Sequence, residues 1–208
     1  MPSDRELLEA WRNGDKAAGE ALFERYYDVL VRFFANKLGG DPLDLIHETF
    51  VGCISGLPRL QQSFRSFLFG IAYNQLKKHY ERRRMDAERF DPTTQTAADL
   101  SPGPGTMLVR SAEQQLLLDA LRRIPVQHQV VLELFYWEEL TSAEIGEALE
   151  LPDGTVRTRL RRARALLEQA LRDMATDPRL YEQTRRDLAR WVAKIRAVQP
   201  GGSDHDGS

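Results

Sequence analysis

The residues best suited to carry out chemistry are the arginines between positions 157 and 164. Three of them and a threonine recur at spacings that place them on one face of a helix, namely Arg157, Thr158, Arg161 and Arg162. A guanidinium can donate two parallel hydrogen bonds to a guanine edge, and it also pairs with phosphate. The pattern therefore predicts binding to DNA, although a solvated basic face on a surface helical hairpin has the same composition.

A helix-turn-helix is the element expected to position these arginines. Its sequence is TSAEIGEALELPDGTVRTRLRRARALL, residues 141–167. Thr141 and Glu144 have the spacing of a capping box, which satisfies backbone donors in the first turn of a helix. The apolar helical spacing stops at Leu149 and resumes at Val156, and Pro152 suits the first turn of a new helix. Two short helices and a tight turn indicate a motif that inserts its second helix into the major groove.

A second basic stretch lies some sixty residues upstream, at SFRSFLFGIAYNQLKKHYERRR, residues 63–84. Its aromatic rings offer faces for unstacked bases, Asn74 offers an amide for base edges, and the lysines and arginines suit phosphates. The same aromatics can equally form a helix core, and composition does not decide between the two interpretations. Two separate basic patches on a chain of net charge −2 indicate two defined contacts with a polyanion rather than non-specific electrostatic binding.

Motifs for catalysis and metal binding are incomplete. His47-Glu48 begins like the zinc motif H-E-x-x-H, but Val51 replaces its second histidine. The four histidines are scattered, and Cys53 is the only cysteine, so we predict no metal, no cofactor and no enzymatic activity. A single cysteine, no apolar run of membrane-spanning length and no visible signal peptide predict a cytoplasmic protein without a membrane partner.

Helical periodicity recurs along the chain, and no stretch alternates with period two, so the predicted fold class is all-α. Helices are expected at residues 4–14, 15–38, 43–57, 64–84, 111–124 and 126–138, ahead of the helix-turn-helix. Residues 91–110 are rich in proline, glycine and polar residues, which predicts a flexible linker. The predicted division is a first domain at 1–90, the linker at 91–110, a second domain at 111–172 and a C-terminal extension at 173–208.

The order of these features resembles the bacterial RNA polymerase sigma factors of the extracytoplasmic function type (group IV of the sigma-70 family). Five segments, in the family's order, cover most of residues 5–171: LFERYYDVLVRFF, DLIHETFVGCISGL, SFRSFLFGIAYNQLKKHYERRR, ALRRIPVQHQVVLELFYWEEL and TSAEIGEALELPDGTVRTRLRRARALL. DLIHETF is similar to the family's D-L-V-Q-E-x-F, and LPDGTVRTRLRRAR to its P-x-G-T-V-x-S-R-L-x-R-A-R. The resemblance implies a sigma2-like helical bundle followed by a sigma4-like helix-turn-helix.

The resemblance also implies partners and site residues. The second domain would bind the promoter −35 element through Arg157, Thr158, Arg161, Arg162 and Arg164. The first domain would melt and bind the −10 element through Arg59, Gln61, Gln62, Ser63, Phe64, Phe67, Asn74, Lys77, Lys78, Tyr80, Arg82, Arg83 and Arg84. It would bind the β′ clamp helices of core RNA polymerase through Asp44, Leu45, Ile46, His47, Glu48 and Phe50. Acidic residues before the helix-turn-helix could face the β flap, and members of the family are often held inactive by an anti-sigma factor.

The chain extends past Leu171, beyond the minimal length of the family. Residues 180–198 can form an amphipathic helix that packs on one of the domains and modulates access to DNA, or a solvated trailing helix. Two other functions stay open at this point. A stand-alone regulator with a LuxR-like helix-turn-helix accounts for the second domain but leaves residues 64–84 unexplained. A helical protein-interaction module, such as an anti-sigma decoy, would need neither DNA contact.

Overall fold

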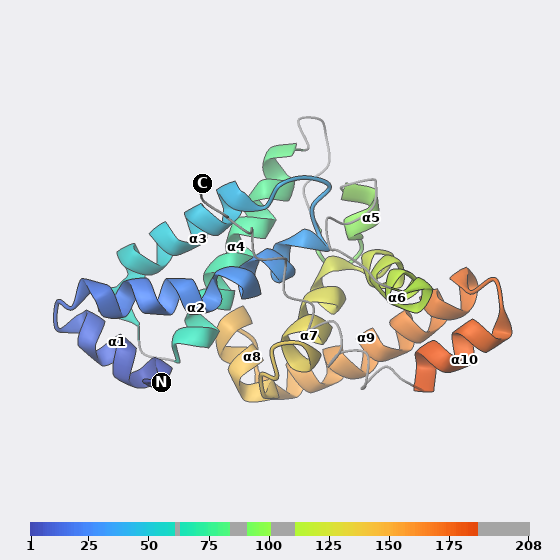
Figure 1. Cartoon of the computed structure of the whole chain (residues 1–208). Helices are drawn as coiled ribbons and strands as arrows, with labels where there is room; N and C mark the ends of the chain where they lie inside the picture. The colour runs from blue at the N-terminus through green and yellow to red at the C-terminus, as the bar shows by residue number, and fades with distance from the viewer. Residues whose placement is uncertain (61–62, 84–90, 101–110, 187–208) are drawn as a thin grey trace, which may run out of the picture.

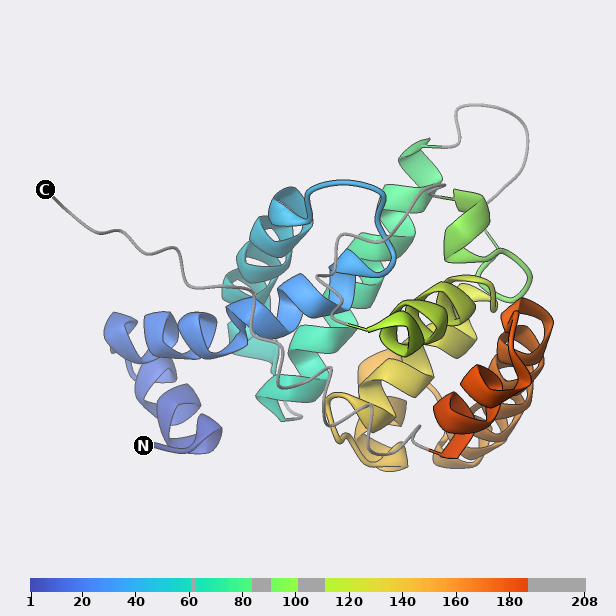
Figure 2. The same cartoon turned by 45° about the vertical axis from the view of Figure 1, so that its right-hand side comes forward.

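The computed structural model describes residues 1–60, 63–83, 91–100 and 111–186, and these residues form helices without a strand. The predicted all-α class is therefore confirmed. The helices form two groups that lie side by side (Figures 1 and 2). We call α1 to α4 the N-terminal group and α6 to α10 the C-terminal group.

The N-terminal group contains α1 (Asp4–Arg12), α2 (Lys16–Ala35), α3 (Leu43–Gly56) and α4 (Phe64–Arg83), with a short 3-10 turn at Leu57–Arg59 before α4. Side-chain caps define two of the starts: Ser3 caps α1 and Asp15 caps α2. Apolar side chains from all four helices form its core, among them Leu8, Leu22, Leu30, Ile46, Leu68 and Leu76. The periodicity located all four helices to within a few residues.

The C-terminal group contains α6 (Ala112–Arg122), α7 (Val126–Tyr136), α8 (Ser142–Leu149), α9 (Asp153–Met174) and α10 (Pro178–Arg186). In Figure 1 the long helix α9 runs along the lower edge of the molecule, beneath α7 and α6. α10 packs against α6 and the end of α9. The extension predicted beyond residue 173 therefore begins with a helix docked on the C-terminal group, while residues 187–208 lie outside the described residues.

The prediction of a flexible linker is wrong for residues 91–100, the first ten residues of the predicted segment. Asp91 holds a tight turn by accepting hydrogen bonds from the backbone and hydroxyl of Thr93, and α5 (Ala97–Leu100) follows. Ala97 is fully buried, and the Gln95 carbonyl accepts a hydrogen bond from the amide of Val126. The few small apolar residues of this segment stand among polar ones without helical spacing. The sequence pattern therefore did not predict that residues 91–100 pack on α6 and α7. Residues 101–110 lie outside the described residues.

The predicted turn of the helix-turn-helix depends on two backbone features. A Cβ atom at Gly146 would lie 2.6 Å from the carbonyl oxygen of Leu151, so only glycine lets the chain turn so closely over α8. Glu150 ends α8 in the left-handed conformation (φ 56°, ψ 47°), and α9 starts directly after Pro152. The capping box of Thr141 and Glu144 is present as predicted.

The two groups are packed against each other along α4 and α8, the most extensive helix pair in the described part of the chain. Both views show α8 beneath α4, with α7 beside the end of α2 (Figures 1 and 2). Two domains on a loose tether, as the sequence suggested, would share no such contact. The described linker segment and the contact together make one continuous body of helices.

Candidate nucleic-acid interface

The arginine face of α9 points to solvent. All five residues predicted to bind the −35 element, Arg157, Thr158, Arg161, Arg162 and Arg164, are exposed. On the opposite side Val156, Leu160 and Ala163 are buried in the core of the C-terminal group. Asp153, one turn earlier, forms a solvent-exposed ion pair with Arg157 at 2.5 Å. The helix thus presents an exposed cationic surface on a rigid base, which is what a recognition helix needs.

Arg164 is exposed but is held at one side of this face. Its Nε donates a 2.8 Å hydrogen bond to the Tyr136 hydroxyl, and its guanidinium lies 5.4 Å from the ring centres of Phe135 and Tyr136. Such an arginine is oriented before any ligand arrives, and its remaining N–H groups suit a phosphate. The structure places it next to, rather than in the middle of, the exposed arginines.

A groove of about 630 Å³ lies beside the recognition helix, between the first turns of α7 and α9. Gln127, His128, Thr155, Thr158, Arg159 and Arg162 are among the residues that line it. His128 is only 9% exposed, and burial, followed by the nearby positive charge of Arg159, lowers its pKa. The imidazole is therefore neutral at neutral pH. Gln127 and His128 were not predicted as site residues, because they precede the helix-turn-helix motif by more than ten residues.

Arg159 lines the groove and is also within electrostatic reach of the other helix group. It is half-buried, and burial lowers the pKa of its guanidinium, while the neighbouring Tyr73 hydroxyl acts in the opposite sense. Tyr73 belongs to α4, the helix predicted to bind the −10 element. The two predicted DNA-binding helices are therefore neighbours in space in this structure.

On α4 the polar residues predicted to contact the −10 element divide into two sets. Ser63, Asn74, Lys78 and Arg82 are exposed, and Lys77 is half-buried with its ammonium 4.8 Å from the centre of the Tyr73 ring. Arg82 also pairs with Glu48 of α3 at 3.3 Å. The side chains of Arg59 and Arg83, and residues 61, 62 and 84, lie outside what the structure describes, so the predictions for Gln61, Gln62 and Arg84 stay open.

Two of the aromatic predictions are wrong in this arrangement. Phe64 is 2% exposed and packs against Trp11 and Tyr26, and Tyr80 is fully buried. Neither ring has a free face for a base, because both fill the core of the helix bundle. Phe67 is half-buried, at the α3–α4 contact beside Gly56. The interpretation of the aromatics as core, left open by the sequence, holds for Phe64 and Tyr80.

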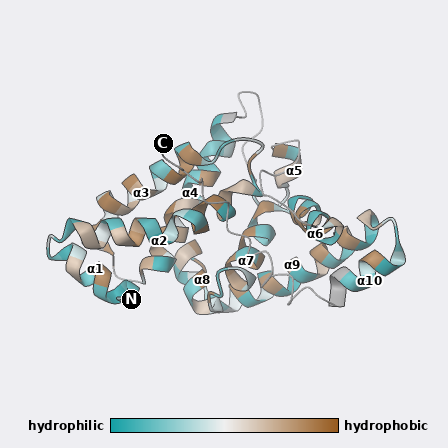
Figure 3. Cartoon of the chain, in the orientation of Figure 1, coloured by the Kyte–Doolittle hydropathy of each residue, from teal (hydrophilic) through white to brown (hydrophobic). Residues whose placement is uncertain are grey.

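Helix α3 has a second apolar stripe, which faces outward. Leu43, Val51 and Ile54 are all about half exposed, at spacings that align them along the helix with His47. Figure 3 shows brown stretches on α3, at the margin of the molecule. Asp44 and His47 are exposed and Glu48 is half-exposed, whereas Leu45 and Ile46 are core residues, which corrects their prediction as polymerase contacts. A helix that is apolar on both sides is the signal that could have revealed this stripe.

Two family models match the chain. Sigma-70 region 2 matches residues 22–85, which include α3 and α4, and Sigma-70 region 4 matches residues 114–167, which include the whole helix-turn-helix. The two matched segments together span more than half of the chain. The chain belongs to the sigma-70 family. Several of its curated relatives are named as factors of the extracytoplasmic function (ECF) type, and the function of this sigma factor is promoter-directed initiation of transcription.

Similar curated proteins agree with this assignment. The ECF RNA polymerase sigma-E factor of Haemophilus influenzae is 25% identical over 185 residues, which cover 83% of this chain and 97% of that protein. The ECF RNA polymerase sigma factor SigW of Bacillus subtilis is 26% identical over 182 residues, with 82% and 97% covered. A solved structure of CnrH in complex with the cytosolic domain of CnrY has the same fold, with a TM-score of 0.59 and 21% identity, over 83% of this chain and 99% of that one.

No helix among the described residues is long and apolar enough to cross a membrane. No group of three His, Cys, Asp or Glu side chains in the same residues is arranged to hold a metal ion. The LuxR-like alternative is not favoured, because it has no counterpart for the region 2 match in the N-terminal group.

Proposed function

We propose that this sigma factor recognises the −35 element with the exposed face of α9. The observation that carries the proposal is the exposure of Arg157, Arg161 and Arg162 on one face of α9. The other face of the helix is buried in the core of the C-terminal group, within the segment that matches Sigma-70 region 4. Arginines on a recognition helix read guanine edges in the major groove, while Arg164, fixed by Tyr136, binds a phosphate.

The −10 element is assigned to the exposed side of α4 and to the loop before it. Asn74, Lys78 and Arg82 lie on the solvent side of that helix, and Ser63 starts it. Cations and an amide on one helix face suit the backbone and base edges of a partly opened duplex. Because Phe64 and Tyr80 are core residues, base stacking falls to Phe67 and to the loop at residues 59–63.

Core RNA polymerase is assigned to the outer stripe of α3. Leu43, Val51 and Ile54 expose apolar surface, and Asp44 and Glu48 border it with negative charge. Such a stripe fits a helical partner that offers apolar residues flanked by basic ones, as the polymerase clamp helices would. Anti-sigma binding, which the family resemblance implies, would compete for the same kind of surface.

Run-off transcription tests this function directly. Purified protein and core polymerase are given a library of randomised promoters, each linked to its own transcribed barcode, and the barcodes in the transcripts are sequenced to identify the promoters used. We expect selection of two conserved blocks, with the upstream block changed by substitutions on α9 and the downstream block by substitutions on α4. Promoter-independent transcripts with every template, or none with any, would contradict the proposed function.

A further inference from the structure

We propose that the groove between α7 and α9 receives a backbone phosphate of the −35 element, and that His128 takes up a proton as the phosphate enters. The inference rests on the proposed function, because it concerns the DNA that α9 binds. It adds a second contact beside the arginine face of α9, and it makes the affinity for promoter DNA depend on pH. Three features carry it: the place of the groove, the positive charge of its walls, and a buried imidazole with an unpartnered nitrogen.

The groove lies where a strand of DNA would pass. The major groove of B-form DNA is about 12 Å wide, and an α-helix with its side chains is about 10–12 Å across. A helix that lies in the major groove therefore has a sugar–phosphate strand along each flank. The groove on the protein adjoins the first turns of α9, and Arg162 belongs both to its lining and to the exposed arginine face. A backbone phosphate is consequently the group that this groove would meet.

The walls of the groove suit an anion. Arg159 and Arg162 bring two guanidinium groups to it, and Thr155 brings a hydroxyl. α9 begins after Pro152, which offers no side-chain cap, so the positive end of the helix dipole is left to other partners. A Cβ atom at Gly154 would meet nothing within 4 Å, so the backbone of this first turn is open to approach. A helix start combined with two arginines is typical of a phosphate site.

His128 is the buried polar side chain of the groove. It is 9% exposed, and its Nδ1 atom has no hydrogen-bond partner among the described residues. Burial, followed by the charge of Arg159, lowers the pKa of His128, and the charge of Arg162 adds to this effect. A hydrogen bond to the backbone of Arg159 acts in the opposite sense. Protonation in the free protein would therefore place a second cation-bearing N–H in a buried position without an acceptor, which is unfavourable.

A phosphate in the groove removes these obstacles to protonation. Its negative charge offsets the charges of Arg159 and Arg162, and its oxygens are acceptors for an imidazolium N–H. An opposite charge within about 4–6 Å favours the charged form of a titratable group. The pKa of His128 therefore rises on binding from its value in the free protein, which lies below about 6.5. Between the two values the complex holds a proton that the free protein lacks, so the affinity falls as the pH rises.

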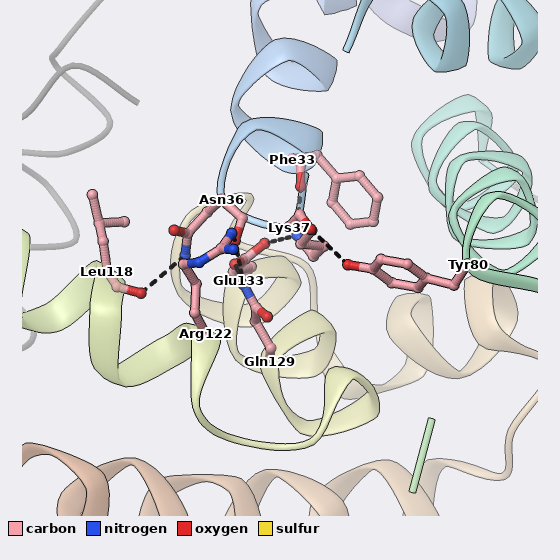
Figure 4. Close-up of polar contacts among 8 residues, drawn as sticks. All are labelled: Phe33, Asn36, Lys37, Tyr80, Leu118, Arg122, Gln129 and Glu133. Atoms are coloured by element: carbon pink, nitrogen blue, oxygen red, sulfur yellow. Dashed lines mark hydrogen bonds and ion pairs between the residues drawn. The ribbon is translucent and has the colours of Figure 1, made fainter. Parts of the chain in front are cut away.

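Other titratable groups around α7 have partners of their own or titrate in another range. Glu133, further along α7, forms a buried ion pair with Lys37, just after α2 (Figure 4). Asp153, at the start of α9, pairs with Arg157, and an aspartate titrates at about pH 4. α6 and α8 also pack on α7, and none of their described charged side chains is a cause of the pKa shift of His128. Among these groups, His128 is the one whose protonation DNA can change near neutral pH.

The pH dependence of promoter binding tests the inference. The 208-residue chain is bound to core polymerase, and a fluorescent promoter duplex recovered from the randomised library is titrated at constant salt between pH 6 and 8. His128→Gln keeps a polar side chain but has no proton to gain, and His128→Asn is a second variant of the same kind. His79→Gln, on α4 in the other helix group, is the matched control. Thermal unfolding shows which variants are folded.

We expect the Kd of the unsubstituted chain and of His79→Gln to rise with pH, by at most about tenfold per pH unit, the limit for a single proton. In His128→Gln and His128→Asn this rise should be lost. The unsubstituted chain should therefore bind several-fold more tightly than these variants at pH 6, and the difference should shrink towards pH 8.

Equal slopes in the unsubstituted chain and the folded His128 variants would overturn the inference, and so would a Kd of the unsubstituted chain that does not change with pH. Failure of the proposed function gives a different result. In that case the library would yield no promoter, and duplexes of any sequence would fail to bind at every pH, which would overturn both proposals together.

Discussion

At the scale of single residues, Arg161 and Arg164 separate base reading from phosphate binding. Arg161 is exposed at the centre of the arginine face, so Arg161→Ala should cost about 1–3 kcal/mol of discrimination at one −35 base pair. Arg164→Ala should weaken binding to all sequences alike and lower the slope of affinity against salt by about one charge. Fluorescence anisotropy of the polymerase complex on promoter variants, at several salt concentrations, measures both.

Arg179→Ala is the control for that pair, since Arg179 is an exposed arginine of α10 away from the recognition face. If Arg161→Ala and Arg164→Ala produced the same sequence-independent loss, the assignment of base reading to Arg161 would be wrong.

His128 makes the stability of the protein depend on pH. Its pKa in the folded protein is lower than about 6.5, the value of a free histidine, because of burial and the adjacent arginines. Below pH 6.5 the unfolded chain therefore binds a proton that the folded chain binds less readily, so the free energy of unfolding falls as the pH falls. Chemical denaturation between pH 5 and 8 should show a steeper loss in the unsubstituted protein than in His128→Gln. Identical slopes would exclude His128 as the cause.

At the scale of elements, the outer stripe of α3 should matter to polymerase and not to folding. Ile54 is 54% exposed, so Ile54→Ser removes little core packing. If that side chain is buried by the clamp helices, its loss should cost about 1–2 kcal/mol of binding, roughly 5- to 30-fold in Kd. Surface plasmon resonance with immobilised core polymerase gives the Kd, and thermal unfolding should show an unchanged midpoint.

Lys16→Ser, on the first turn of α2, is an exposed substitution outside the stripe and should leave the Kd unchanged. Equal affinities for the unsubstituted protein, Ile54→Ser and Lys16→Ser would show that polymerase binds elsewhere.

Helix α10 has a structural role in the C-terminal group. Leu180 and Tyr181 pack on the core, and the Tyr181 hydroxyl contacts Arg172 at 3.3 Å and Glu168 at 3.2 Å. Removing residues 175–208 should therefore lower the free energy of unfolding by about 1–3 kcal/mol, from lost apolar burial. Urea denaturation measures it. If promoter binding and transcription by the truncated protein were also unchanged, the extension would have no regulatory effect on DNA access.

At the scale of the whole molecule, the sequence was sufficient where local rules decide. The capping box of Thr141 and Glu144 and the apolar periods located the helices, and the exposed arginines of α9 were predicted individually. Predictions failed where distant parts of the chain determine the environment. Phe64 and Tyr80 are core residues because α1 and α2 cover them, and residues 91–100 are ordered because α6 and α7 lie beneath. No local pattern indicated that Lys37, just after α2, would form a buried ion pair with Glu133 of α7.

The Lys37–Glu133 pair also has a consequence for the newly made chain. Its two residues are 96 positions apart, so Lys37 leaves the ribosome long before its partner exists. At synthesis rates of 5–20 residues per second, the gap lasts roughly 5–20 s. During that interval the N-terminal group can fold with the surface of α4 that later contacts α8 uncovered. A nascent chain thus passes through a stage in which Lys37 has no Glu133 to pair with.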